Sequence, residues 1–259
     1  MSYTRELAGA FLALAFAIHS EAAEEKKDEK KEEAPKVTKA IPFAITSGTT
    51  NRFKVRGLNL TNATALRFIS NQSIAGEIKS RGSAKVPDKA DAKKVGDTLL
   101  EVELVLPDDF PPGDLPFVVT MPEGDTGTNR LCVVQRDVLF DEKEPNGDFR
   151  KPNDVKMPQT IRGTIGAAAD VDVFRFEGRA GEKLYVETAS VCYGSLLDPI
   201  VSVHDAKGHT LMTRDDRSGS ADPSFAFVVP ADGTYLVSVM DAHDRGGENY
   251  NYLLIIHRE

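Results

Sequence analysis

Asp170-Val-Asp-Val-Phe-Arg-Phe176 alternates polar and apolar residues, and the acidic run Glu142-Lys-Glu-Pro-Asn-Gly-Asp148 precedes it in the chain. Successive residues of a β-strand point to opposite faces, so the first stretch predicts a strand that buries Phe174 and Phe176 on one side. The same alternation recurs in short runs after residue 37, and Gly, Pro, Asn and Asp separate these runs. The pattern predicts an all-β protein.

The alternating runs form two groups, which predict two β-sandwich domains. Residues 37–136 hold the first group, whose clearest period-2 runs are 100–106 and 115–121. The Lys-rich stretch 79–94 is predicted to be a loop. Residues 137–259 hold about eight short strands, a number typical of a sandwich with a jelly-roll-like path. The second domain is therefore expected to be jelly-roll-like.

The N-terminus predicts export. Arg5 supplies a positive charge, the apolar run 7–18 is too short to span a bilayer comfortably, and Ser20-Glu-Ala22 offers small residues for cleavage. Residues 1–23 are therefore predicted to be a signal peptide, with an uncleaved membrane anchor as the alternative. The almost entirely charged residues 24–36 predict a disordered linker. This organisation predicts a secreted, periplasmic or cell-envelope protein.

Composition argues against some partners and limits the role of the cysteines. The net charge is −8 and the pI is about 5.3, so most of the surface would repel a nucleic-acid backbone. Trp is absent and aromatic residues make up 7%, which argues against a binding site of exposed rings. Cys132 and Cys192 fall in different predicted domains, each in an apolar context. We predict two buried free thiols, with a disulfide as the alternative in an exported protein.

Oxygen-bearing side chains gather at the boundary between the two predicted domains. The run 142–148 carries a carboxylate or an amide at every second position, which places these groups on one side of an extended segment. Two further carboxylates begin the strand at 170–176. Calcium takes about six to eight oxygen ligands from carboxylates, amides and backbone carbonyls, so this pattern predicts a calcium site. The predicted ligands are Glu142, Glu144, Asn146, Asp148, Asp170 and Asp172.

The alternative interpretation makes residues 142–148 a solvated linker whose carboxylates disperse into water. A second acidic group, Asp215 and Asp216 with Asp222, lies in a stretch rich in Ser and Gly and is predicted to be a surface loop. The sequence contains no H-E-x-x-H, G-x-S-x-G or Walker motif, and His243 is predicted to be a loop residue. We therefore assign no catalytic residues and predict that the protein is not an enzyme.

Seven motifs follow one another from the acidic run toward the C-terminus. They are Glu142-Lys-Glu-Pro-Asn146, Gly163-Thr-Ile165, Asp170-Val-Asp-Val-Phe174, Ala180-Gly-Glu182, Leu197-Asp-Pro199, Asp205-Ala-Lys-Gly208 and Pro230-Ala-Asp-Gly-Thr-Tyr235. In order and spacing they resemble the bacterial pre-peptidase C-terminal domain, a β-sandwich module found beside secreted proteases. Gly147 departs from that pattern, because many members carry Asp directly after the Asn. Since collagen-binding members hold calcium at an equivalent acidic segment, the resemblance implies a calcium-stabilised junction.

The first predicted domain carries a shorter set of motifs. They are Ile45-Thr-Ser-Gly48, Phe53-Lys-Val-Arg-Gly57-Leu-Asn59-Leu60 and Ala65-Leu-Arg-Phe68. They resemble an immunoglobulin-like module of the IPT/TIG kind, which implies binding or spacing. The two resemblances together predict a non-catalytic exported protein that is stabilised by calcium and binds an extracellular polysaccharide or protein surface. A structural or assembly partner of a separate envelope protein or protease is the alternative, and a glycan-acting enzyme is the third hypothesis.

Overall fold

The structure, a computed structural model, describes residues 34–88 and 90–259. The predicted signal peptide, residues 1–23, and positions 24–33 of the predicted linker lie outside the described residues. The first strand already begins at Lys36, within the range predicted to be linker. Nearly all regular structure is strand, which confirms the predicted all-β class, and the described residues belong to one compact unit.

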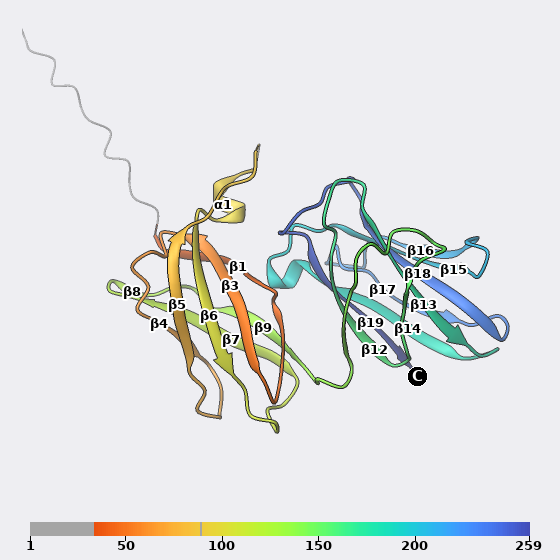
Figure 1. Ribbon diagram of the computed structural model, residues 1–259, viewed down its shortest axis with the longest axis horizontal. Helices are drawn as coiled ribbons and strands as arrows, with labels where there is room; N and C mark the ends of the chain where they lie inside the picture. The colour runs from red at the N-terminus through yellow and green to blue at the C-terminus, as the bar shows by residue number, and fades with distance from the viewer. Residues whose placement is uncertain (1–33, 89) are drawn as a thin grey trace, which may run out of the picture. The chain divides into compact units, whose positions relative to one another are not determined.

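The first half of the chain forms one continuous path of hydrogen-bonded strands, coloured orange to yellow-green in Figure 1. The strand order is β1-β3-β6-β5-β4-β7-β9-β2, and β8 pairs with β7. The strands are β1 (Lys36–Ile41), β2 (Ala44–Thr46), β3 (Thr50–Leu58), β4 (Ala65–Phe68), β5 (Gly76–Ser83), β6 (Thr98–Val105), β7 (Gly113–Met121), β8 (Gly124–Asp125) and β9 (Asn129–Val134). A short helix, α1 (Ala92–Val95), precedes β6.

Consecutive strands β1 and β2 stand at the two ends of this path. Strand β1 pairs antiparallel with β3, whereas β2 pairs in parallel with β9. Pro42 lies between them, and its ring nitrogen has no hydrogen to donate to a ladder. The chain therefore leaves one edge of the path and joins the other within two residues, so the strands enclose a core as a sandwich does.

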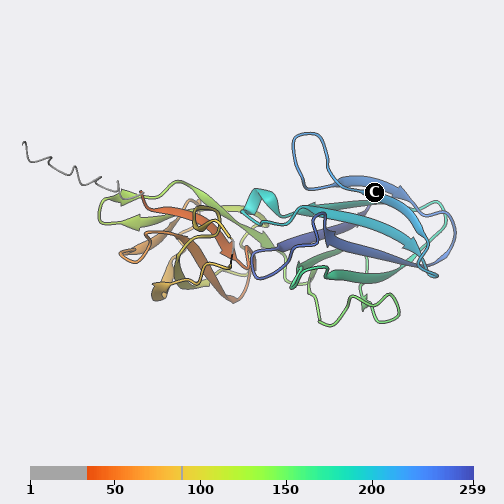
Figure 2. The same ribbon diagram turned by 90° about the horizontal axis from the view of Figure 1, so that it is seen from above.

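The second half forms two five-stranded sheets, coloured green to blue and seen from above in Figure 2. One sheet has the order β10 (Leu139–Asp141), β12 (Gln159–Thr164), β19 (Asn251–Arg258), β14 (Lys183–Ala189) and β17 (Ser224–Val228). The other has the order β11 (Asn153–Asp154), β13 (Val171–Gly178), β18 (Gly233–Asp241), β15 (Pro199–Asp205) and β16 (Thr210–Arg214). From β12 onward the chain crosses repeatedly between the sheets, as the predicted jelly-roll-like path requires.

The alternating residues form the two cores. In β13, Phe174 and Phe176 are buried as predicted, and they pack with Tyr252 of β19 inside the second sandwich. The first core contains the inward residues of β6 and β7 and also takes up Leu253 of β19, which is fully buried. Tyr193, from the short 3-10 helix Val191–Tyr193, stacks on Phe43 with ring centroids 4.5 Å apart. Packing is therefore continuous between the two halves.

Two predictions from the sequence need correction. Residues 79–83 belong to β5 and 92–95 to α1, although the whole stretch 79–94 was expected to be a loop. Most of β5 is exposed, so it lacks the apolar alternation that marks a half-buried strand. Both cysteines are free, but Cys192 is exposed in the 3-10 helix and Cys132 is half-buried, so neither is the fully buried thiol that we expected.

Candidate metal centre

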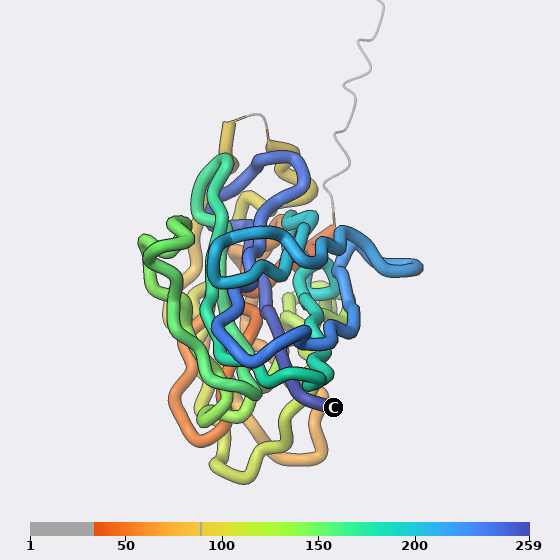
Figure 3. The backbone as a smooth tube through the Cα atoms, turned by 90° about the vertical axis from the view of Figure 1, so that its right-hand side faces the viewer, coloured from red at the N-terminus to blue at the C-terminus, as the bar shows by residue number. Residues whose placement is uncertain are grey.

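The acidic segment lies in the loop between β10 and β11. Figures 2 and 3 show this green segment running along the outside of the second sandwich. The side chain of Asn153 closes the loop, because its Oδ1 accepts a hydrogen bond from Lys143 N at 2.7 Å. Phe149 rests edge-on against the ring of His204 in β15, with centroids 4.9 Å apart. The loop is thus attached to the sandwich on both sides of its acidic residues.

Three predicted ligands converge at the start of β13. Glu144 of the loop, Asp170 before the strand and Asp172 within it each offer a carboxylate oxygen, and these oxygens lie within 4.8 Å of one another. Asp170 is held by the backbone, because its Oδ2 accepts from Gly166 N at 2.7 Å and its Oδ1 from Val171 N at 3.0 Å. Residues separated by about 25 positions therefore form one carboxylate cluster.

Asn146 follows two residues after Glu144 in the loop, and its side chain is completely buried. Neither its Oδ1 nor its Nδ2 has a hydrogen-bond partner among the described residues, and the same holds for the buried Oδ1 of Asp172. Buried polar atoms are normally satisfied, so the unpartnered oxygens of Asn146 and of Asp172, which is one of the three converging carboxylates, are donors that a hard cation site would use. The Asn146 backbone N–H donates to Glu144 Oε2 at 2.9 Å, which ties the two residues together.

Gly147 has a steric reason to differ from the family pattern. A Cβ atom at this position would lie 2.8 Å from the carbonyl oxygen of Val171, closer than a side chain tolerates. The loop backbone therefore approaches β13 directly at the residue after Asn146. Asp148, which was predicted to join the ligands, points elsewhere: it forms an ion pair with Arg150 at 2.9 Å. That contact lowers the pKa of Asp148 to about 2.

Glu142 lies on the inner side of the cluster and shares a partner with Asp172. Its Oε1 accepts from Thr164 N at 2.6 Å, and its Oε2 accepts from the hydroxyl of Tyr252 at 3.3 Å. The same hydroxyl lies 2.6 Å from Asp172 Oδ2. Gly163 makes room for this arrangement, because a Cβ there would lie 2.3 Å from the Tyr252 ring. The tyrosine thus positions two of the predicted ligands.

Burial determines the charge of this pair. It raises the pKa of Asp172, and the neighbouring Glu142 raises it further. Burial likewise raises the pKa of Glu142 well above the ordinary carboxyl range. Two carboxylates that cannot both ionise hold a proton between them at neutral pH. A bound cation would reverse this preference, because a positive charge favours the ionised form of both groups.

Tyr252 was not among the predicted site residues. In the sequence it is one of several alternating apolar residues of the last strand, and such a residue ordinarily fills a core. Its hydroxyl is the only feature that sets it apart, since a buried tyrosine usually needs a polar partner. The strand pattern alone does not show that this partner is the acidic pair, which lies 80 and 110 positions away in the sequence.

The second acidic group differs from the sequence-based expectation. Asp215 and Asp216 are exposed and meet Asp198, with carboxylate oxygens within 4.8 Å of one another. Asp222 is not a surface residue as predicted: it is 1% exposed and accepts a hydrogen bond from Ser190 N at 3.1 Å. Asp215 and Asp216 are exposed and Asp198 is half-buried, and this trio lacks the buried unpartnered oxygens that mark the first cluster.

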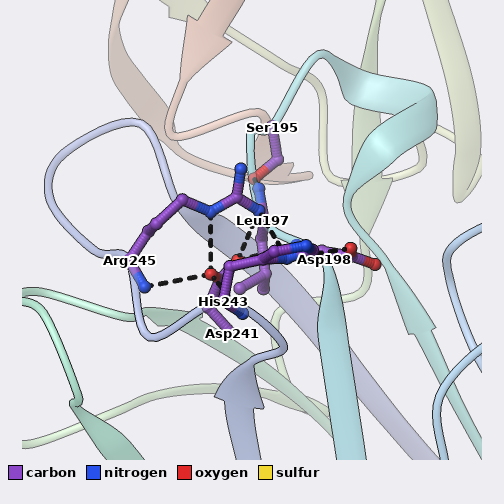
Figure 4. A network of polar contacts seen from close by, with 6 residues as sticks. All are labelled: Ser195, Leu197, Asp198, Asp241, His243 and Arg245. Atoms are coloured by element: carbon purple, nitrogen blue, oxygen red, sulfur yellow. Dashed lines mark hydrogen bonds and ion pairs between the residues drawn. The ribbon is translucent and has the colours of Figure 1, made fainter. Parts of the chain in front are cut away.

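A buried carboxylate organises the loop beside this trio, as Figure 4 shows. Asp241 accepts from the backbone N–H groups of Asp198, His243 and Arg245, each at 3.0 Å. The Arg245 guanidinium adds contacts of 2.9 and 3.0 Å. Burial alone would raise the pKa of Asp241, but these hydrogen bonds lower it below the usual range. His243 is a loop residue, as predicted, and its Nδ1 lies 3.4 Å from Asp198 Oδ2.

No family model matches the chain. A probable subtilase-type serine protease of Deinococcus radiodurans is 34% identical over 102 residues, which is 38% of this chain and 14% of that protein. The chain therefore corresponds to a small part of the protease's length.

Two solved structures are similar to parts of the chain. The pre-peptidase C-terminal domain of a Bacillus anthracis collagenase matches with 14% identity and a TM-score of 0.34, over 44% of this chain and 99% of that domain. A periplasmic inhibitor of g-type lysozyme from Aeromonas hydrophila matches with 17% identity and a TM-score of 0.32, over 41% of this chain and 96% of that one.

Within residues 34–88 and 90–259, no helix has the length and the apolar character needed to cross a membrane.

The immunoglobulin-like resemblance of the first half stays a prediction. The similarity to the subtilase-type protease, together with the ordered motifs from Glu142 to Tyr235, supports a pre-peptidase C-terminal-like domain in this chain.

Proposed function

We propose that this chain is a non-catalytic exported protein of two β-sandwich modules, residues 37–136 and 137–259. In this proposal the second module binds calcium at the carboxylate cluster and attaches to an extracellular polymer or protein surface. The calcium part rests on one observation: Glu144, Asp170 and Asp172 converge, and the buried oxygens Asp172 Oδ1 and Asn146 Oδ1 have no hydrogen-bond partner among the described residues.

The donor set favours calcium over other common metals. The ligands are Glu144, Asn146, Asp170 and Asp172, with Glu142 beside them, and all of these supply oxygen. Zinc prefers nitrogen and sulfur ligands, and the cluster contains neither histidine nor cysteine. Magnesium demands a tighter octahedral shell and keeps several waters, whereas calcium accepts carboxylates and amide oxygens in flexible geometry. Glu142 and Asp172 would lose their shared proton when calcium binds.

Calcium at this cluster would act on the fold. It would join the loop 142–152 to the start of β13 and neutralise carboxylates that otherwise repel one another. The loop lies where the second module begins, so the ion would make this boundary rigid. A 102-residue match that covers 14% of a protease favours an accessory role for the shared part. Binding to a surface, without chemistry, is the function we infer for the module.

We expect Asp172→Asn to weaken calcium binding by at least about tenfold. Mutating a residue that only orients a metal ligand typically lowers the affinity by about 10–100-fold, and Asp172 is proposed to be a ligand itself. Asn is close to Asp in shape and suits a site where the apo protein already keeps a proton, so the variant should fold. Isothermal titration of the chelator-treated protein with calcium measures the affinity. Asp215→Asn, in the exposed acidic trio, is the matched control and should bind as the wild type does. Equal affinities for all three proteins would refute the assignment of the site.

The binding partner is tested by co-sedimentation. The purified protein is mixed with insoluble collagen, with insoluble polysaccharides and with bacterial envelope fractions, in calcium and in excess chelator. Retention on collagen or on a polysaccharide, reduced by chelator and by Asp172→Asn, supports the proposed function. Retention only on envelope fractions, lost after protease treatment of those fractions, favours the assembly partner instead. No retention on any of these materials would reject the binding proposal.

A further inference from the structure

Two cationic side chains are buried next to each other in the first half of the chain. Lys39 of β1 lies directly opposite Arg56 of β3 in the antiparallel ladder. Each residue is only 2% exposed. Directly opposed residues of an antiparallel pair extend to the same face, about 5 Å apart at their Cβ atoms. Two positive charges thus lie side by side where little water reaches them.

The donors of this pair are only partly satisfied. Arg56 forms an ion pair with Glu248 through Nη1, and its Nη2 donates to the carbonyl oxygens of Lys85 at 2.9 Å and Gly96 at 3.0 Å. Its Nε has no partner among the described residues, and neither does Nζ of Lys39. A buried charged donor without an acceptor is costly, so both nitrogens call for a negatively charged or polar atom near them.

The charges around the pair do not balance. Glu248, from the loop between β18 and β19, is the carboxylate that acts on both cations, and its side chain is 59% exposed. Burial lowers the pKa of Lys39 to about 8, Arg56 lowers it as well, and Glu248 opposes them. Below that pKa the lysine is protonated, so at neutral pH two cations share one carboxylate. Within these contacts, the two cations exceed the carboxylates by one positive charge.

We propose that a small monovalent anion, with chloride as the ligand to test, binds between Nζ of Lys39 and Nε of Arg56. One negative charge balances the excess, and a spherical anion accepts from both donors without a preferred direction. A divalent oxyanion would leave a buried negative charge beside Glu248. A water bridging Lys39 to another buried acceptor, such as the unpartnered Oδ1 of Asn249, is the competing occupant.

Anomalous diffraction decides between the anion and the water. Crystals grown without halide are soaked in sodium bromide, and data are collected at the bromine absorption edge. A bromide peak within hydrogen-bond distance of Lys39 Nζ and Arg56 Nε is the expected result. A fully ordered water at that position with no anomalous signal would overturn the proposal, and so would bromide bound only on the exposed surface.

Solution measurements test the same site without crystals. Thermal unfolding is followed in sodium chloride and in sodium gluconate of equal ionic strength. Above its Kd, each tenfold increase in chloride should raise the ratio of folded to unfolded protein about tenfold in the wild type. Lys39→Met should lose this response and keep its fold, because an apolar side chain suits the buried position. Lys54→Met, at an exposed lysine of β3, the strand that carries Arg56, is the control and should respond as the wild type does.

Alkaline titration provides an independent readout. The folded pKa of Lys39 is lowered, so the unfolded chain binds more protons between about pH 8 and about pH 10.4, and stability rises with pH in this window. A bound anion favours the protonated lysine, so chloride should flatten this rise in the wild type. Identical pH profiles in chloride and gluconate would contradict the proposal, even if Lys39→Met failed to fold.

Discussion

Removing calcium with excess chelator should lower the melting temperature by roughly 5–10 °C at about pH 8, for protein first held near 100 times its Kd. At that saturation the ion contributes about 2.7 kcal/mol to the free energy of unfolding. The physical origin is the cluster around Asp172, where carboxylates repel one another and buried oxygens lack partners unless a cation binds. Differential scanning calorimetry with and without chelator measures the shift.

The size of this shift should depend on pH. The pKa values of Glu142 and Asp172 are raised in the metal-free fold, so that fold holds more protons than the unfolded chain above about pH 4. The stability of the metal-free protein therefore falls as pH rises through this window. Calcium competes with the bound proton, so its contribution grows over the same range. The difference between the two melting curves should be small at about pH 5 and large at about pH 8.

Two variants show whether the response belongs to this cluster. Glu144→Ala should abolish the calcium-dependent shift, because it removes one of the three converging carboxylates. Asp148→Asn should keep it, because Asp148 is engaged by Arg150 outside the cluster. An unchanged melting curve in chelator, or a full shift in Glu144→Ala, would contradict the calcium site.

Replacing Asp241 with Ala should lower the free energy of unfolding by about 3 kcal/mol or more. The carboxylate is 1% exposed and accepts hydrogen bonds from three backbone N–H groups and from Arg245. Ala would leave these donors without their acceptor, and each buried unsatisfied donor costs about 1–3 kcal/mol. Urea denaturation followed by circular dichroism measures the change.

The effect should come from the backbone donors more than from the ion pair. Arg245 is 44% exposed, so Arg245→Ala should cost much less, on the order of 1 kcal/mol. Asp215→Ala, an exposed acid of the nearby trio, should stay within about 0.5 kcal/mol of the wild type. The interpretation fails if Asp241→Ala costs no more than Arg245→Ala, because the charge pair would then account for the whole effect.

Strands could be predicted from the sequence where one face of the strand is buried and the other is exposed. The runs around Leu100 and Phe174 alternate in the sequence, and they form β6 and β13 with the predicted residues inward. Strand β5 was missed because Ile78 is the only large apolar residue on its half-buried face, so no apolar period marks it. The same limit applies to β16, whose residues are nearly all exposed. Burial on one side is what makes a strand visible in a sequence.

The candidate metal site could be predicted from the sequence only in part. Alternation suggested that 142–148 would present its acids on one side, but the segment forms a loop, and Asp148 turns to its neighbour Arg150. The burial of Asn146 and the position of the Tyr252 hydroxyl between Glu142 and Asp172 depend on how distant segments pack. Local spacing carries no information about such contacts.

The chain by itself determines that it is all-β, acidic and rich in oxygen ligands between residues 142 and 172, because periodicity and residue type are local properties. Tertiary structure decides which of those oxygens converge, which carboxyls share a proton and which acid pairs with an arginine instead. It also places Lys39 and Arg56 together in the interior, a pair that no spacing in the sequence reveals. Charge and pKa depend on burial and on neighbours from other strands, and only the folded chain supplies these.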